Sequence, residues 1–320
     1  MIMRSLLLLI PLALWTAVFI NPGIPRKEIT ASFLGFVWAF ISSLILNSFF
    51  IQQGLLNFTI SDNLFYGVPL DWIIAQAIIL GTLIPLCRLL GWSKPAQQIL
   101  QVVAVVFLYY SVGLIFFTLN SLIIVISSTL LVAMPARMLS AYTANDSHIR
   151  IRCALQALAW ASLLLWFFPS TVFYLTSDNW LSLIQRDLIV TAIYCLPLLI
   201  PAGLLISALY QFATEGNGTA FPYDPPKNLV TGGIYQYISN PMQLGICLMM
   251  GWWGVVIQSM WIFISALIAL VLFIVFKDVC NGSCAIGNGN PQWESYQQAV
   301  PKWIPKLNAH YSAHNKNTET

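Results

Sequence analysis

Long apolar runs limit what this chain can fold into more than any other feature. The mean hydropathy is +0.78 and only 8% of the residues are charged, so no sizeable soluble domain fits between the runs. Runs of bilayer-spanning length fall at about 5–21, 31–56, 69–92, 98–118, 120–136, 151–174, 187–213, 241–258 and 260–277. The sequence therefore predicts an all-α, polytopic membrane protein with about nine transmembrane helices.

Two of these runs need interpretation. The first has the charge and apolar core of a signal peptide, but NPGIPRKEIT follows it without a small-residue cleavage site, so we expect a retained helix. The stretch from Gln98 to Met138 is too long for one crossing, and the polar residues around Asn120 are the place where it can turn. Asp71 and Asp187 fall at span ends, where we expect interfacial charges.

The basic residues predict an orientation, because short cytoplasmic loops carry an excess of Lys and Arg. With nine alternating spans, Arg4 and Arg186 lie on one side, and the other twelve of the 14 basic residues lie on the opposite side. This split favours both the number of spans and a cytoplasmic carboxyl terminus, and we expect the membrane to be a bacterial inner membrane. The net charge of +3 then reflects topology, and no basic patch indicates nucleic acid as a partner.

Several classes of site are disfavoured. GxGxxG and P-loop patterns are absent, and no intramembrane series of acids, arginines or histidines marks an ion path, which argues against a transporter. The spacings CNGSC and HYSAH resemble a zinc site. However, the segment between them is too long for a zinc finger, and the histidines lie in a polar tail. We therefore predict no metal site.

The segment GNGTAFPYDPPKNLVTGGIYQYISNPMQLG, residues 216–245, stands out from the apolar chain. Its prolines cannot continue a helix, and its glycine pair allows a sharp turn or a close approach to a ligand. Asn240 before Pro241 is typical of a helix start, and the free amides of a helix start suit a carboxylate or another anion. The residue types alone favour a capped connecting loop over a ligand site.

The order of these residues resembles the signature of the isoprenylcysteine carboxyl methyltransferase and phospholipid methyltransferase superfamily. The matching residues are Gly216, Gly218, Thr219, Pro222, Pro225, Pro226, Leu229, Val230, Gly233, Tyr235, Asn240, Pro241, Met242 and Gly245. The later WESYQQAVPKWIP is similar to the family's carboxyl-terminal tail. The resemblance covers about residues 190–307. The first five or six spans have no recognised counterpart.

The resemblance implies a helical-bundle domain that binds S-adenosylmethionine at the cytoplasmic surface, while a lipid or another lipophilic acceptor enters from the bilayer. The cofactor-binding residues that it implies are Leu229, Val230, Gly233, Tyr235, Asn240, Pro241 and Gly245. It assigns no catalytic residue. The aromatic residues of the tail beside Lys302 and Lys306 are interpreted either as an interfacial lid or as ordinary membrane-belt residues.

The polar positions of the signature depart from the family. Gln236 and Ser239 stand where the family has arginines, and Gln243 stands where it has a tyrosine. The family's acidic pair aligns near Asn281 and Gly282. Because both charge types are missing together, we interpret the change as the replacement of one polar network, whose members would lie near one another.

Three functions remain open. The first is an S-adenosylmethionine-dependent membrane methyltransferase acting on a lipophilic acceptor. The second is a degenerate scaffold or binding subunit, with a membrane-protein partner held through the amino-terminal helices. The third is a reductase-like protein, since sterol reductases share a related architecture. The predicted domains are residues 1–186, a methyltransferase-like part at 187–307, and a polar, disordered tail at 308–320.

Overall fold

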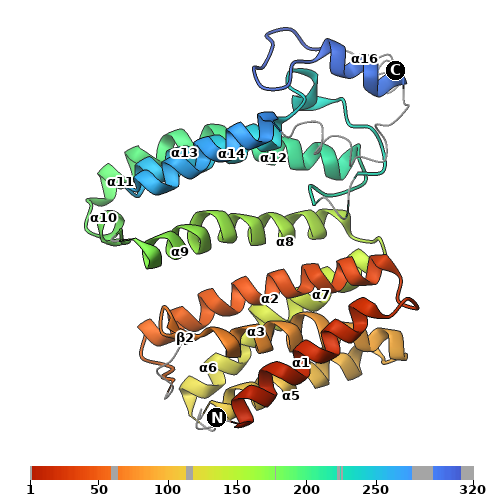
Figure 1. Cartoon of the computed structure of the whole chain (residues 1–320), viewed down its shortest axis with the longest axis vertical. Coiled ribbons are helices and arrows are strands. Elements are labelled where there is room, and N and C mark those ends of the chain that lie inside the picture. The colour runs from red at the N-terminus through yellow and green to blue at the C-terminus, as the bar shows by residue number, and fades with distance from the viewer. Residues whose placement is uncertain are drawn as a thin grey trace. The chain divides into compact units, whose positions relative to one another are not determined.

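The computed structural model describes residues 2–58, 64–112, 118–176, 178–221, 224, 226–275 and 291–310, with side chains from Leu8 onward. Within these ranges the chain is 76% helical, with almost no sheet (Figure 1). It divides into two compact units, Met1–Trp160 and Ala161–Thr320. The boundary at 186/187 marks where the family resemblance begins, and as a domain boundary it stays a prediction.

The first unit is a helical bundle with one short hairpin. Its helices are α1 (Ile2–Ile20), α2 (Arg26–Gln52), α3 (Leu70–Ile78), η1 (Ile79–Leu83), α4 (Ile84–Leu86), η2 (Cys87–Leu90), α5 (Lys94–Ser111), α6 (Leu119–Ser127), η3 (Ser128–Ala133), α7 (Met134–Ala144) and most of α8 (Ile149–Ser162). Strands β1 (Leu64–Phe65) and β2 (Val68–Pro69) pair antiparallel. Tyr66 and Gly67 form their turn with positive φ, as a two-residue hairpin loop requires.

The second unit continues the helix that α8 begins. Its elements are η4 (Leu163–Phe167), α9 (Phe168–Leu175), α10 (Leu181–Ile184), α11 (Leu188–Cys195), η5 (Leu196–Leu198), α12 (Leu199–Thr214), η6 (Gly233–Gln236), α13 (Pro241–Val256), α14 (Met260–Val275) and α16 (Pro291–Ala299). Asp187 caps α11, because its carboxylate accepts from the amides of Ile189 and Val190. This agrees with its predicted place at a span end.

Prolines explain the π-helical turns inside the long helices. Pro85, Pro135 and Pro169 each follow a π-helical turn, η1, η3 and η4 respectively, by two residues. A proline has no N–H, and its ring clashes with the carbonyl four residues earlier. The wider π turn relieves this clash, so the helices pass through their prolines without ending.

A helix covers each of the nine predicted runs in the described part of the chain. Five helical segments are long and apolar enough to cross a membrane, by length and composition: Arg26–Gln52, Leu70–Leu90, Leu119–Ala144, Ile149–Leu175 and Leu188–Thr214. Three shorter apolar helices are Leu8–Ile20, Pro241–Val256 and Met260–Val275. Helix α5 meets neither description, since its first turns carry a lysine and three glutamines. The helical membrane class is confirmed, and the count of nine is not.

Helix α2 packs at the centre of the first unit. It crosses η1 at a pair of glycines, where a Cβ on Gly35 would lie 2.1 Å from the carbonyl oxygen of Gly81. The Thr82 hydroxyl donates to the Ser32 carbonyl at 3.2 Å beside this crossing. Small residues at such a crossing let the two backbones touch, which is how helices gain packing energy when lipid provides no hydrophobic drive.

A buried polar network lies in the same bundle. The Tyr109 hydroxyl donates to Asn47 Oδ1 at 2.9 Å and lies 2.8 Å from Ser128 Oγ, and all three residues are 0% exposed. The Trp72 indole donates to the Leu108 carbonyl at 3.3 Å. These bonds join four helical segments that are far apart in sequence. Because polar groups in an apolar interior need partners, the network favours one arrangement of these segments.

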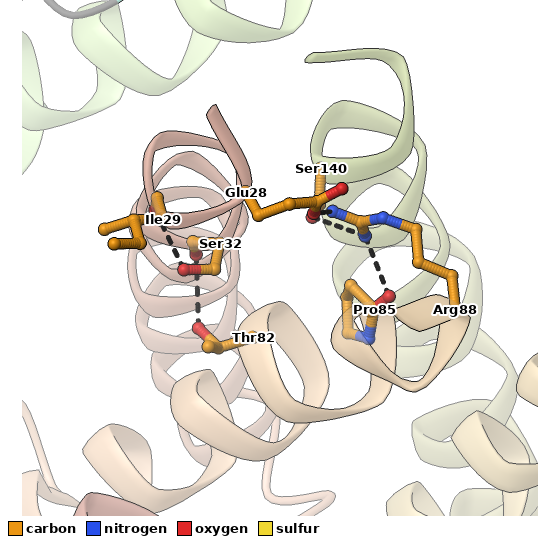
Figure 2. A network of polar contacts seen from close by, with 7 residues as sticks. All are labelled: Glu28, Ile29, Ser32, Thr82, Pro85, Arg88 and Ser140. Atoms are coloured by element: carbon orange, nitrogen blue, oxygen red, sulfur yellow. Dashed lines mark hydrogen bonds and ion pairs between the residues drawn. The ribbon is translucent and has the colours of Figure 1, made fainter. Parts of the chain in front are cut away.

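An ion-pair cluster ties the segments together at one end of this unit. Figure 2 shows Arg88 reaching Glu28, with its guanidinium also donating to the Pro85 carbonyl at 2.8 Å and to Ser140 Oγ at 3.2 Å. Lys27, which precedes Glu28 in the sequence, forms a second ion pair: its ammonium lies 3.1 Å from the Asp146 carboxylate. Lys27 and Arg88, which come from two of the predicted cytoplasmic loops, therefore lie at the same end of the bundle.

Candidate functional site

The signature segment connects the end of α12 to the start of α13. Between α12 and α13 its described residues form no helix apart from the short η6, and α13 begins at Pro241 as predicted. Helices α12 and α13 pack against each other, so the segment lies at one end of this pair. Figure 1 shows α16 and the tail at the same end of the second unit.

The first half of the segment closes on itself. The Gly216 carbonyl accepts from the amides of both Lys227 and Asn228, at 2.7 and 3.1 Å. The Thr219 hydroxyl donates to the Asp224 carbonyl at 2.9 Å. A Cβ on Gly216 would lie 2.8 Å from the Phe212 carbonyl oxygen. The signature glycine at 216 is therefore required by closure of the loop.

The glycine pair is held by the last turn of α12. The Gly232 amide donates to Glu215 Oε2 at 3.1 Å, and a Cβ on Gly232 would lie 1.9 Å from Oε1 of the same carboxylate. Gly233 has φ +55°, and a Cβ there would lie 2.1 Å from Gln211 Nε2. Sequence reasoning missed Gln211 and Glu215. The signal in the sequence is their four-residue spacing at the end of an apolar run, because residues four apart lie on the same face of a helix.

Two predicted cofactor-binding residues lie in a packed core. Val230 and Tyr235 are 6% and 5% exposed and pack with Ala208, Tyr296 and Val300. The Tyr235 ring also stacks on that of Phe212, with ring centroids 5.4 Å apart. Both side chains thus hold the segment onto α12 and the tail. Leu229, which precedes Val230, is partly exposed.

Helix α13 begins with a residue that does not cap it. Asn240 is 9% exposed and occupies the cap position, yet its side chain makes no capping hydrogen bond. Pro241 and Gly245 are buried, and a Cβ on Gly245 would lie 2.8 Å from Leu205 Cγ, so this glycine permits the close approach of α12. The predicted helix start is confirmed, with Asn240 at the N-cap position, although the Asn240 side chain does not cap the helix.

Residues 300–310, called the tail from here on, cover the signature segment by main-chain contacts. The amides of Ser239, Lys306 and His310 donate to the carbonyls of Pro301, Tyr237 and Gln236, at 2.9, 3.1 and 3.1 Å respectively. The Tyr296 hydroxyl donates to the Tyr235 carbonyl at 2.7 Å, and burial raises the pKa of this phenol. Tyr296 is therefore a core residue and not a membrane-belt residue.

Two residues that depart from the family pattern contact this tail. Gln236 and Ser239, which replace family arginines, contribute main-chain groups to the contacts with His310 and Pro301. Ser239 Oγ also lies 3.4 Å from the Pro301 carbonyl. Asn281 and Gly282 lie outside the described residues, so their predicted proximity to Gln236 and Ser239 stays a prediction.

The start of α13 is the part of the site that fits an anionic group. Its first-turn amides have no side-chain cap, the positive end of the helix dipole lies there, and the buried Asn240 carboxamide is not used by the helix. The other signature glycines are explained by contacts within the chain. The residues present thus fit the carboxylate end of S-adenosylmethionine, the cofactor that the resemblance implies.

Two other parts of the molecule have features of binding sites. Among the described residues, no group of three or more His, Cys, Asp or Glu could hold a metal, while Cys280, Cys284 and His314 lie outside them. An apolar groove of about 310 Å³ lies between α9 and α14, lined in part by Leu175, Trp261 and Ile264. It involves the first turns of α14, at the end of the helices away from the signature segment, so it is separate from the candidate site.

The fold and the site define a polytopic helical membrane protein with a packed polar segment at one end of its second unit. Residues 191–280 match the family model described as phospholipid methyltransferase. The carboxyl-terminal part of the chain is therefore a domain of the isoprenylcysteine and phospholipid methyltransferase superfamily. No curated protein and no solved structure matches the chain.

Proposed function

We propose that this protein is an S-adenosylmethionine-dependent membrane methyltransferase whose acceptor is a lipid or another lipophilic molecule. The observation that carries the proposal is the start of α13, where the family signature places Asn240 and Pro241 and where the buried Asn240 side chain is not used as a cap. The match over residues 191–280 supports methyl transfer as the class of reaction.

The chain's own residues would bind and orient the cofactor. The first-turn amides of α13 and the Asn240 carboxamide would hold its carboxylate, since a helix start carries free donors and a positive dipole end. The glycine pair, fixed by Glu215 and Gln211, would set the path of the backbone around the site. When bound, the cofactor supplies an electrophilic methyl group.

Catalysis in this proposal rests on alignment and on exclusion of water. Methyl transfer from a sulfonium needs the acceptor, the methyl carbon and the leaving sulfur in line, and little covalent help. The tail that covers residues 236–239 would keep water from the reacting groups. A lipid acceptor fits a domain built from apolar helices, and we place the site at the cytoplasmic face of a bacterial inner membrane.

The scaffold hypothesis is the second candidate, and one observation favours it. Gln236 and Ser239 are uncharged, although the family uses arginines at these positions. Main-chain contacts at Gln236 and Ser239 occur there instead. In this alternative the domain would serve as a binding subunit, with a protein partner on the amino-terminal helices.

Binding of S-adenosylmethionine to the full-length protein in nanodiscs separates the two candidates. The wild-type protein should bind, and Asn240→Ala should bind about tenfold or more weakly, because a hydrogen bond to a charged group is lost. Its thermal stability should stay close to wild type, since the side chain does not cap α13. Transfer of a labelled methyl group to extracted lipids would then identify the acceptor class.

The matched control for this experiment is Asn228→Ala. Asn228 is also a carboxamide of the segment, but its side chain donates to the Glu215 carbonyl within the loop. Cofactor affinity should change less in this variant than in Asn240→Ala. Absence of binding by the wild-type protein at millimolar cofactor would reject the enzyme and leave the scaffold.

A further inference from the structure

Two large apolar side chains project from the tail where no helix explains them. Leu307 is 98% exposed and Ile304 is 79% exposed, and neither belongs to a helix or strand. Most other large exposed apolar residues lie on apolar helices, where lipid would cover them. An extended segment outside the helices has no such cover, so these two residues need another apolar surface.

The same stretch is positively charged. Lys302 and Lys306 flank Ile304, and residues 300–310 contain no Asp or Glu. The Lys306 ammonium donates to the Ala299 carbonyl at 3.2 Å, and Trp303 is partly exposed beside them. We call Lys302, Trp303, Ile304, Lys306 and Leu307 the tail surface. Apolar and aromatic residues mixed with lysines are typical of segments that lie in the membrane interface.

The other side of this stretch is fixed to the protein. Val300 and Tyr296 are 1% and 2% exposed in the core that they share with Val230 and Tyr235. The amide of Lys306 donates to the Tyr237 carbonyl, between two exposed members of the tail surface. The backbone that presents Ile304 and Leu307 is therefore tied by hydrogen bonds to residues 236–239.

The tail surface also lies at the end of two apolar helices. It packs on the segment between the end of α12, part of a candidate membrane span, and the start of the apolar helix α13, which is where a bilayer surface is expected. Side chains at this depth meet lipid headgroups and the upper acyl chains. Lysines at this depth, such as the partly exposed Lys302 and Lys306, can contact the phosphates of anionic lipids.

We propose that the tail surface docks on anionic phospholipids of the bilayer that the protein spans, and that docking holds the tail closed over residues 236–239. Ile304 and Leu307 enter the interface, and Lys302 and Lys306 contact the lipid phosphates. The negative charge of the membrane thereby controls how often the signature segment opens. This inference concerns lipid binding and does not depend on methyl transfer.

Hydrogen exchange of three amides tests the proposal. The amides of Ser239, Lys306 and His310 form the bonds that close the tail, so their exchange reports its opening. The full-length protein is compared in nanodiscs of phosphatidylcholine alone and of phosphatidylcholine mixed with phosphatidylglycerol. We expect exchange at these amides to be slower by about fivefold for each engaged lysine in the anionic discs.

Variants separate the two parts of the surface. Lys302→Gln leaves the hydrogen bond from Lys306 to the Ala299 carbonyl intact. It should remove about half of the slowing of amide exchange that anionic lipid causes, measured on a logarithmic scale. The double variant Ile304→Ser with Leu307→Ser should raise exchange by roughly tenfold in both kinds of disc, because apolar burial is lost. Gln298→Ser is the control, because Gln298 is an exposed residue of α16. This variant should change neither the exchange rates of the three amides nor their response to anionic lipid.

Three outcomes would overturn the proposal. Equal exchange of the three amides in both kinds of disc would show that the tail does not sense lipid charge. An undiminished lipid response in Lys302→Gln would remove this lysine from the contact. Protection that depends on having two copies of the protein in each disc would identify the tail surface as a protein interface instead.

Discussion

The two units of this protein pack their helices in different ways. In the first unit, 61% of the apolar 18-residue stretch in Leu70–Leu90 is buried. In the second unit, only 6% of the corresponding stretch in Leu188–Thr214 is buried. The first unit contains the glycine crossing, the Tyr109 network and the Arg88 cluster. The second unit has smaller cores, one of which includes the signature segment and the tail.

This difference shows where each unit obtains its order. Helices surrounded by lipid gain little from burying apolar side chains, so the first unit relies on close backbone contact and polar bonds between helices. The second unit leaves α11 and α12 open to lipid and concentrates its packing around Tyr235 and Tyr296 at one end. We therefore expect substitutions in the first unit to act on the bundle, and those around Tyr296 to act on the site.

The largest effect is expected at the glycine crossing of the first unit. Gly35→Leu should destabilise the protein by at least about 3 kcal/mol, because the added side chain collides with the backbone of η1, which cannot move aside cheaply. Thermal unfolding in detergent measures this. Gly203→Leu on α12 is the control, since a Cβ there meets nothing within 4 Å. Equal losses in the two variants would break the comparison between the units.

A smaller effect is expected at the ion pair in Figure 2. Arg88→Met should destabilise the first unit by about 2 kcal/mol, between the values for exposed and fully buried pairs, because both side chains are 15% exposed. Adding Glu28→Gln should then cause little further loss, since the partner charge is already gone. A double-mutant cycle from denaturant unfolding measures the coupling. Additive losses would show that the cluster does not hold the bundle end together.

The smallest effect is expected in the core of the second unit. Tyr296→Phe should destabilise the domain by about 1 kcal/mol, because the hydrogen bond to the Tyr235 carbonyl is lost. The pKa of Tyr296 is raised by burial, so the folded state retains its proton. Below about pH 10, the usual phenol pKa, the hydroxyl makes its full contribution to the free energy of unfolding. At higher pH this contribution is lost progressively, because the phenol of the unfolded chain loses its proton first.

The readout of this variant is a pair of unfolding curves, one near neutral pH and one above pH 10. The stability difference between wild type and Tyr296→Phe should narrow as the pH rises, because only the wild type loses stability from this group. A difference that stays constant with pH would mean that the phenol is not buried as the structure has it. It would also weaken the assignment of the tail to the core of the second unit.

Local signals in the sequence predicted much of the architecture. Each apolar run became helical, Asp187 took a span end, and the Asn-Pro pair at 240 and 241 began α13. These features depend on neighbouring residues, through hydropathy, backbone restriction by proline and the need to cap a helix. The π turns before Pro85, Pro135 and Pro169 follow from the same local physics.

What the sequence determined by itself was the helical membrane class, the family of the carboxyl-terminal part and the location of its signature. Only the tertiary structure decided what the signature residues do. It placed Glu215 and Gln211 against the glycine pair, left Asn240 without a capping role, and bonded the tail to residues 236–239. The physical reason is distance along the chain: Tyr235 and Tyr296 are 61 residues apart, and such contacts arise only when helices pack. Hydrophobicity and local propensity depend on neighbouring residues only. They therefore do not predict which distant backbone group will form a hydrogen bond with a given side chain.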